Sequence, residues 1–180
     1  MLLHEALTLP ASRRAQVVIG AAGLRCEVRS VHMVDHPDLL PWVRPHQLLL
    51  TTSYAWPRDA AAQCALVTAL AAAGLATIGL AVPHFFDHFP PPVCDAAEAA
   101  GLPLLELPWE TLFAQITEEL HRAILAEQAS TIERSEVIHR TLTQAAVEGR
   151  SLQDVAATLS GLLQRAVSRC ICRRVCGVMS

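Results

Sequence analysis

Three hydroxyl residues in succession, Thr51, Thr52 and Ser53, directly follow the short apolar run 48–50. An apolar run of this length, closed by small hydroxyl residues, is typical of a strand buried on both faces of a sheet. Ligands of open α/β sheets bind at the carboxyl ends of such strands, where side chains and free backbone groups converge. The stretch therefore predicts a strand over 46–53 whose end is a candidate binding site. The same hydroxyl residues also favour helix caps and turns, and this second interpretation stays open.

Two further polar residues follow predicted strands. Asp35 comes after the stretch 27–34, whose alternating pattern favours a strand, and His84 comes after the apolar stretch 75–82. Because parallel strands end at one edge of a sheet, we expect Asp35 to lie on the same edge as Thr51. The candidate ligand-binding residues are Asp35, Thr51, Thr52, Ser53 and His84.

Histidines at helical spacing could also bind a metal ion. His84 and His88 would lie on one face of a helix, a spacing that metal sites use. Pro83 and Pro90 flank them, however, and phenylalanines interleave the segment, which favours a loop at a strand end. A looser group of two histidines and an aspartate within 32–36 is equally weak evidence for a metal site. We predict no metal site.

Enzyme motifs are absent from the sequence. It contains no phosphate-cradling G-x-x-x-x-G-K-[ST], no G-x-S-x-G elbow and no G-x-G-x-x-G. Glu106 falls within a predicted strand, and Glu110 falls near a helix start, where carboxylates ordinarily interact with the helix dipole. No nucleophile stands at a suitable spacing from a base. We therefore predict neither catalysis nor a cofactor; an α/β enzyme with a site built from loops is the remaining alternative.

The elements that position these residues follow from the spacing of apolar residues. The order strand–helix–strand–helix–strand, with short connections, implies right-handed crossovers and a mainly parallel sheet. The predicted fold class is α/β: a mainly parallel sheet of about four to five short strands flanked by helices, followed by a long C-terminal connector helix. Strands are predicted over 16–19, 27–34, 46–53, 75–82 and 102–107, and helices over 2–7, 59–73, 93–100 and from 110 onward.

The long helix carries a row of apolar residues at helical spacing. These residues could pack on the sheet of their own domain or against a second protomer, and we expect a homodimer. The predicted domains are an α/β domain over 1–127, a connector helix over 128–148 and the start of a second domain over 149–180. The apolar row of the helix consists of Phe113, Ile116, Leu120 and Ile124.

Composition excludes several classes of protein. The formal net charge is −3 and the isoelectric point about 6.2, so the chain lacks the basic surface that neutralises phosphates. Aromatic residues make up 4%, which argues against base-stacking platforms for nucleic acid. DNA binding by this polypeptide alone is therefore not expected.

Three features predict a cytoplasmic protein that does not enter the membrane. The first 20 residues lack the form of a signal peptide. Cysteines before position 100 occur singly among apolar residues, as in reduced proteins. The uncharged run 60–83 is long enough to span a bilayer, but Gly74 and Gly79 interrupt it and its end favours β-structure. A helix followed by a buried strand explains this run better.

Three segments, in this order and at fitting distances, resemble the N-terminal domain of the purine catabolism regulator (PucR) family. They are GLRCEVRSVHMVDHPDLLPWVRPHQLLLTTSYAW, LAAAGLATIGL and AAEAAGLPLLELPWETLFAQIT, within a match from about Leu2 to Gln128. The resemblance implies a ligand-sensing domain at the front of a bacterial transcriptional regulator of purine or nitrogen catabolism. It also implies a small polar effector at the strand ends, a relay through the long helix, and DNA contact only through a C-terminal domain absent from this chain. The alternative is a ligand-free dimerisation or interaction module without catalytic activity.

The end of the chain departs from this resemblance. After Leu163 the family pattern implies a further strand, whereas the chain ends in RCICRRVCGVMS, which suggests a truncated or frame-shifted product. The arginines of 165–174 supply no element that could dock on nucleic acid. The C-x-C-x-x-x-C spacing of Cys170, Cys172 and Cys176 is not that of a zinc site.

Overall fold

The computed structural model describes residues 1–148 and 154–155. The chain divides into two compact units, Met1–Glu127 and Gln128–Ser180. The predicted features of the C-terminal tail, including its arginine and cysteine clusters, lie outside the described residues. All candidate ligand-binding residues lie in the first unit.

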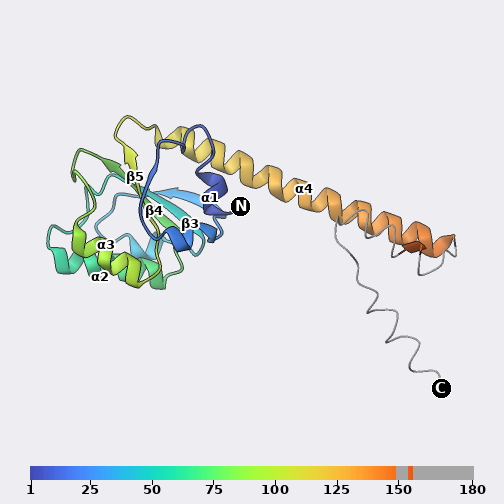
Figure 1. Ribbon diagram of the computed structural model, residues 1–180, viewed down its shortest axis with the longest axis horizontal. Coiled ribbons are helices and arrows are strands. Elements are labelled where there is room, and N and C mark those ends of the chain that lie inside the picture. Colours follow the sequence, from blue (N-terminus) through green and yellow to red (C-terminus); the bar gives the residue numbers. More distant parts are fainter. Residues whose placement is uncertain (149–153, 156–180) are drawn as a thin grey trace, which may run out of the picture. The chain divides into compact units, whose positions relative to one another are not determined.

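A five-stranded sheet forms the centre of the first unit, in the order β1-β5-β4-β3-β2 (Figure 1). Strands β2 to β5 are parallel, and β1 joins β5 antiparallel at one edge. The mainly parallel sheet predicted from the order of strands and helices is confirmed. The strands are β1 Gln16–Ile19, β2 Ser30–Met33, β3 Gln47–Thr51, β4 Thr77–Val82 and β5 Leu104–Pro108.

Two helices connect the central parallel strands, close to the predicted positions. Helix α2 (Ala60–Ala72) begins where the Asp59 side chain accepts a hydrogen bond from the Ala62 amide at 2.9 Å. It ends before Gly74, whose φ of +81° suits a residue without a β-carbon. Helix α3 (Pro91–Ala99) starts in the proline run, where missing amide hydrogens cost nothing.

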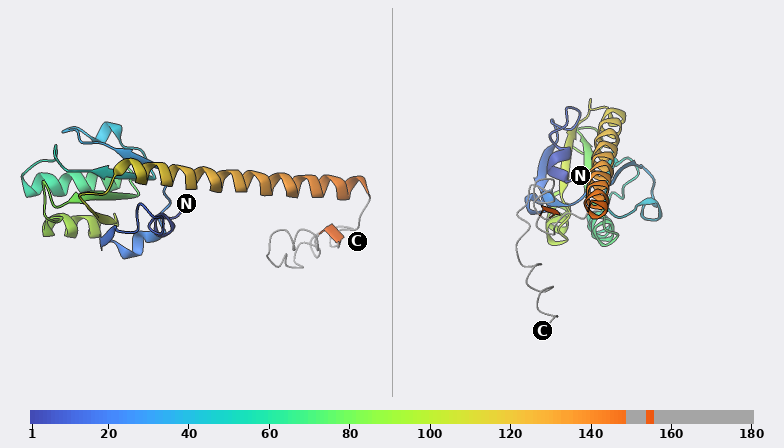
Figure 2. Two further views of the ribbon diagram at one scale, coloured as in Figure 1. Left: turned by 90° about the horizontal axis from the view of Figure 1, so that it is seen from above. Right: turned by 90° about the vertical axis from the view of Figure 1, so that its right-hand side faces the viewer.

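Helices cover both faces of the sheet, as Figures 1 and 2 show. Helices α2 and α3 pack on one face, over Leu49 and Ile78, whereas α1 (Leu3–Ala6) and the first turns of α4 pack on the other. Leu48 and Leu50 point to that second face. Burial on both sides explains why β3 is a continuous apolar run rather than an alternating pattern.

Helix α4 (Phe113–Val147) is long, and its first part packs on the sheet of its own domain. Ile116 and Leu120 are each 1% exposed and Ile124 is 5% exposed. Phe113 is partly buried against the same core. The apolar row predicted for dimerisation or internal packing is therefore occupied within the domain in this structure.

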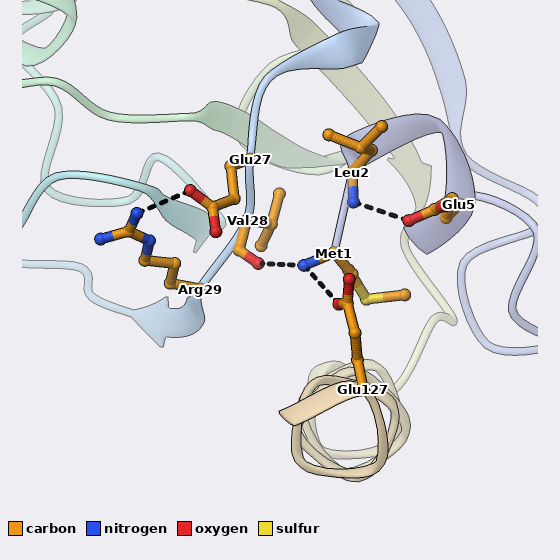
Figure 3. A network of polar contacts seen from close by, with 7 residues as sticks. All are labelled: Met1, Leu2, Glu5, Glu27, Val28, Arg29 and Glu127. Carbon is orange, nitrogen blue, oxygen red and sulfur yellow. Dashed lines mark hydrogen bonds and ion pairs between the residues drawn. The ribbon is translucent and has the colours of Figure 1, made fainter. Parts of the chain in front are cut away.

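Polar side chains on α4 also accept hydrogen bonds from backbone groups of the same domain. Glu119 accepts from the Ala11 amide at 2.8 Å, and the His121 ring accepts from the Val31 amide of edge strand β2 at 3.3 Å. Glu127 lies 2.8 Å from the amino group of Met1, which also donates to the Val28 carbonyl (Figure 3). These contacts satisfy backbone groups that neither a helix nor the sheet pairs.

The two largest differences from the predicted boundaries are of three residues each. The strand predicted over 27–34 is shorter, because residues before Ser30 pair with the N-terminal segment: Val28 donates to the Met1 carbonyl at 2.8 Å. The helix predicted from Glu110 begins at Phe113, because the Thr111 amide closes a turn onto the Pro108 carbonyl at 2.8 Å.

Within the part of the chain that the structure describes, no helix combines the length and the apolar character needed to cross a membrane.

Candidate functional site

Four of the five candidate residues form one hydrogen-bonded group, which we call the polar corner: Asp35, Thr51, Thr52 and Ser53. The Thr51 hydroxyl donates to Asp35 Oδ1 at 2.6 Å. The amide and hydroxyl of Thr52 donate to Asp35 Oδ2 at 3.1 and 2.7 Å. Asp35 therefore lies on the same sheet edge as Thr51, as expected, because β2 and β3 are parallel neighbours.

The members of the polar corner differ in accessibility. Thr51 and Ser53 are both buried, and the Thr51 hydroxyl accepts from the Ser53 amide at 2.9 Å. Ser53 has a φ of +62°, and its hydroxyl donates to the Thr52 carbonyl, so these two residues brace a tight turn. Asp35 is exposed and Thr52 half-buried. A ligand could reach the Asp35 carboxylate, which three hydrogen bonds hold in place and whose remaining lone pairs can accept further N–H donors.

The fifth candidate, His84, belongs to a second group, which we call the strand-end aromatic cluster: Tyr54, His84, Phe85 and Trp109. The His84 and Trp109 rings stack at a centroid distance of 4.0 Å and an interplanar angle of 22°. Phe85 meets Tyr54, His84 and Trp109 in edge contacts at 5.1, 4.5 and 6.2 Å. These residues follow β3, β4 and β5, so three neighbouring strand ends build the cluster.

The two groups adjoin each other. The Tyr54 amide approaches the Thr52 hydroxyl oxygen at 3.4 Å, and the Trp109 amide donates to the Val82 carbonyl at 2.7 Å. The polar corner thus occupies the ends of β2 and β3, and the strand-end aromatic cluster extends the same edge to β5. Polar and aromatic groups together line the carboxyl edge of the parallel strands.

The sequence interpretation missed Tyr54, Phe85 and Trp109 as site residues. Each of them lies within a few positions of a strand end, the same signal that identified Asp35 and His84. The low aromatic content of 4% concealed them, because an average over the chain says nothing about where aromatic residues gather.

A buried carboxylate holds the loop that carries His84 and Phe85. Glu106 of β5 is 7% exposed, and its Oε1 accepts a hydrogen bond from the Phe89 amide at 2.9 Å. Its Oε2 lies 3.0 Å from Nδ1 of His88. This hydrogen bond, together with the negative charge of Glu106, raises the pKa of His88. The two contacts offset the free-energy cost of burying the Glu106 carboxylate, and they fix the end of the loop.

The same contacts separate the two histidines that were weighed as a metal pair. His84 stacks on Trp109, whereas His88 bonds to Glu106. In the described ranges, no group of three or more His, Cys, Asp or Glu side chains is arranged to hold a metal ion. An internal cavity under α4, lined mostly by leucines, measures about 10 Å³. It has room for one water molecule at most and is too small for a metabolite.

The fold and the site define a class: an α/β domain with polar and aromatic groups gathered where such sheets bind ligands. The chain belongs to the purine catabolism regulatory protein-like family, whose sequence profile matches residues 5–124. The resemblance noted in the sequence is thereby confirmed. The match lies within the first unit and includes the polar corner and the strand-end aromatic cluster.

Two relatives with curated names share this similarity. The chain is 25% identical over 164 residues to the purine catabolism regulatory protein of Bacillus subtilis (strain 168), covering 91% of this chain and 31% of the relative. It is 26% identical over 145 residues to the transcriptional activator PmfR of Paenarthrobacter nicotinovorans, covering 80% of this chain and 31% of the relative. The chain therefore spans about a third of the length of either relative, and both names denote regulatory proteins.

Proposed function

We propose that this chain is the ligand-sensing domain of a bacterial transcriptional regulator of purine or nitrogen catabolism. Its effector is a small polar metabolite that binds at the carboxyl ends of the parallel strands, in contact with Asp35, Thr52 and His84. Thr51 and Ser53 are both buried, so their role is to position the residues that contact the effector. The observation that carries the proposal is the fixed, exposed carboxylate of Asp35, held by three hydrogen bonds at the position where open α/β sheets bind ligands.

Such a site is preorganised: its groups already have the arrangement that binds the ligand. Purine breakdown products carry several N–H groups, which the Asp35 carboxylate can accept. Because Thr51 and Thr52 already orient this carboxylate, binding does not have to order it.

The relay runs through helix α4 to the rest of the regulator. Trp109 lies at the sheet edge, and α4 begins four residues later, at Phe113. A ligand that contacts this edge can bias the start of the helix. It shifts the equilibrium only as far as it binds one arrangement of α4 more tightly than the other. DNA contact belongs to another domain of the regulator, which acts as a homodimer in the cytoplasm.

A thermal-shift screen of purine catabolites at millimolar concentration tests the proposal. We expect at least one catabolite to raise the melting temperature of the chain and of Asp38→Asn, a control for an exposed carboxylate in the same loop. The same compound should leave Asp35→Asn unshifted. If no catabolite stabilises the chain at this concentration, or if Asp35→Asn responds fully, the proposed site is wrong.

A second function, a ligand-free dimerisation module, is favoured by one observation on α4. Several large apolar residues beyond the packed turns are exposed, among them Leu125 at 63%, Ile132 at 60% and Val137 at 45%. Sedimentation of a chain that ends at Gln128, compared with one that ends at Gly149, separates the alternatives. If only the longer chain is dimeric, the connector part of α4 dimerises; if both are equally dimeric, it does not.

A further inference from the structure

The strand-end aromatic cluster is not part of the hydrophobic interior. Tyr54 is 64% exposed and Trp109 38% exposed, and His84 is exposed as well. Within the described residues, neither hydrophobic core includes any of the four rings. The burial of apolar surface that stabilises the fold therefore does not account for their gathering at one place.

The geometry of the cluster keeps aromatic surface available. Phe85 is half-buried and contacts each of the other three rings, so it is the central ring of the cluster. Tyr54 and Trp109 lie on separate strand-end segments, and both keep accessible surface. Glu106 fixes the segment that carries His84 and Phe85 through the Phe89 amide. The rings are thus held in place before any ligand arrives.

We propose that the strand-end aromatic cluster is the stacking surface of the effector site, and that it selects a planar, unsaturated ring with N–H or carbonyl groups on its rim. This inference rests on the proposed function, because the polar corner supplies the hydrogen bonds for the rim. Aromatic faces attract flat π-systems through close stacking, which a puckered ring or an open chain cannot match. Tyr54 follows Ser53 directly in the chain, and the Thr52 hydroxyl donates to Asp35, so the cluster and the polar corner occupy neighbouring strand ends of the same sheet edge.

A small ring fits these observations better than a protein surface does. The cluster consists of four side chains, and its member Tyr54 directly follows the polar corner in the chain. Ligand sites combine an apolar surface with a few placed polar groups in this way. The cluster also lies at the edge where parallel sheets bind small molecules.

The test is isothermal titration calorimetry of the full chain with four probes. Xanthine and urate are planar bicyclic rings, whereas allantoin is non-planar and allantoate is an open chain. All four carry N–H and carbonyl groups, and each planar probe is compared with the non-planar probe of similar charge: xanthine with allantoin, and the anion urate with the anion allantoate. We expect the planar probes to bind about tenfold more tightly or better, since one stacked ring can contribute that much. Equal or tighter binding of the non-planar probes would overturn the inference.

Three substitutions locate the binding surface. Tyr54→Leu and Trp109→Leu should each weaken binding of the planar probe about tenfold, whereas Trp109→Phe, which keeps an aromatic face, should restore most of it. Trp42→Leu is the matched control, because Trp42 is 58% exposed, lies in the 3-10 helix Leu40–Trp42 and, among the described residues, has no ring contact with the cluster. Tyr54 is the more exposed ring, so Tyr54→Leu decides the matter if Trp109→Leu does not fold.

The outcomes distinguish this inference from the function on which it rests. Suppose that a probe binds the unmodified chain and that Asp35→Asn abolishes this binding. If Tyr54→Leu then leaves the binding unchanged, the sensory site stands and the stacking surface is refuted. If no probe of either kind binds the unmodified chain, both are refuted.

Discussion

Aromatic residues occur in two settings in this domain, and the comparison shows what each set does. Trp56 and Phe89 lie in the core under α2 and α3, with ring centroids 6.5 Å apart and exposures of 5% and 4%. Tyr54, two residues before Trp56 in the sequence, is 64% exposed at the sheet edge. The chain thus passes from the surface cluster into the core within a single turn.

The difference follows from how an α/β sheet is covered. Helices pack on the two faces of the sheet, so a ring that points to a face is buried. The carboxyl ends of the strands have only loops around them, so rings placed there keep contact with solvent. Rings at the faces therefore stabilise the fold, and rings at the strand ends are available for binding.

The largest expected effect separates the two settings directly. Phe89→Ala should lower the free energy of unfolding by about 3–5 kcal/mol, because it leaves a cavity in the core. Tyr54→Ala, at an exposed ring, should change it by less than about 0.5 kcal/mol. Urea unfolding followed by circular dichroism measures both values. Similar losses for the two variants would mean that the strand-end aromatic cluster is structural after all.

The same contrast exists along helix α4. Leu120 is 1% exposed, so Leu120→Ala should cost about 2–5 kcal/mol of unfolding free energy. Leu125→Ala, at a residue 63% exposed on the same helix, is the matched control and should cost less than about 0.5 kcal/mol. Urea unfolding of both variants is the measurement. A large loss for Leu125→Ala, growing with protein concentration, would instead reveal a dimer contact at that residue.

Much of the fold could be predicted from local patterns. The run 48–50 predicted β3 because both of its faces are buried, and Asp59 with Gly74 bracketed α2. The proximity of Asp35 and Thr51 followed from one rule, that parallel strands end at one edge. Each of these inferences needs only residues that are close in sequence or a general property of sheets.

Other features depend on distant parts of the chain and carry no local signal. Glu106 looked like an ordinary strand residue, because its partners at Phe89 and His88 are brought to it only by the folded loop. The strand-end aromatic cluster takes its members from three separate loops, so no periodic pattern marks it. The place of β1 beside β5 was equally hidden, since antiparallel pairing at an edge depends on the completed sheet.

A smaller effect is expected where Glu106 holds the edge loop. Glu106→Gln should cost about 1–3 kcal/mol of unfolding free energy, because the amide replaces an ionised acceptor within the fold. Glu110→Gln, at an exposed position, is the control and should cost less than about 0.5 kcal/mol. Urea unfolding again gives the values. A neutral Glu106→Gln would show that the negative charge of Glu106 does not contribute to holding the loop.

The smallest effect is a pH dependence at His88, which belongs to the edge and not to the core. Glu106 raises the pKa of His88 above its ordinary value of 6.5, first through a hydrogen bond and then through its charge, to which Asp87 adds. Protonated His88 therefore stabilises the folded state. This stabilisation is fully present below the pKa of the unfolded chain and is lost as the pH rises through the folded pKa. The melting-temperature difference between the unmodified chain and His88→Gln should accordingly shrink as the pH rises from about 6 to about 8.

A double-mutant cycle sharpens this last prediction. If Glu106 is the group that holds the proton on His88, the pH dependence of the His88→Gln effect should vanish in a Glu106→Gln background. Phe89→Ala, which removes a core ring beside the same loop, lowers stability without abolishing the pH dependence, because it leaves both titrating groups in place. A pH dependence that survives Glu106→Gln would assign the proton to another partner. The contact with Glu106 would then not be the cause of the raised pKa of His88.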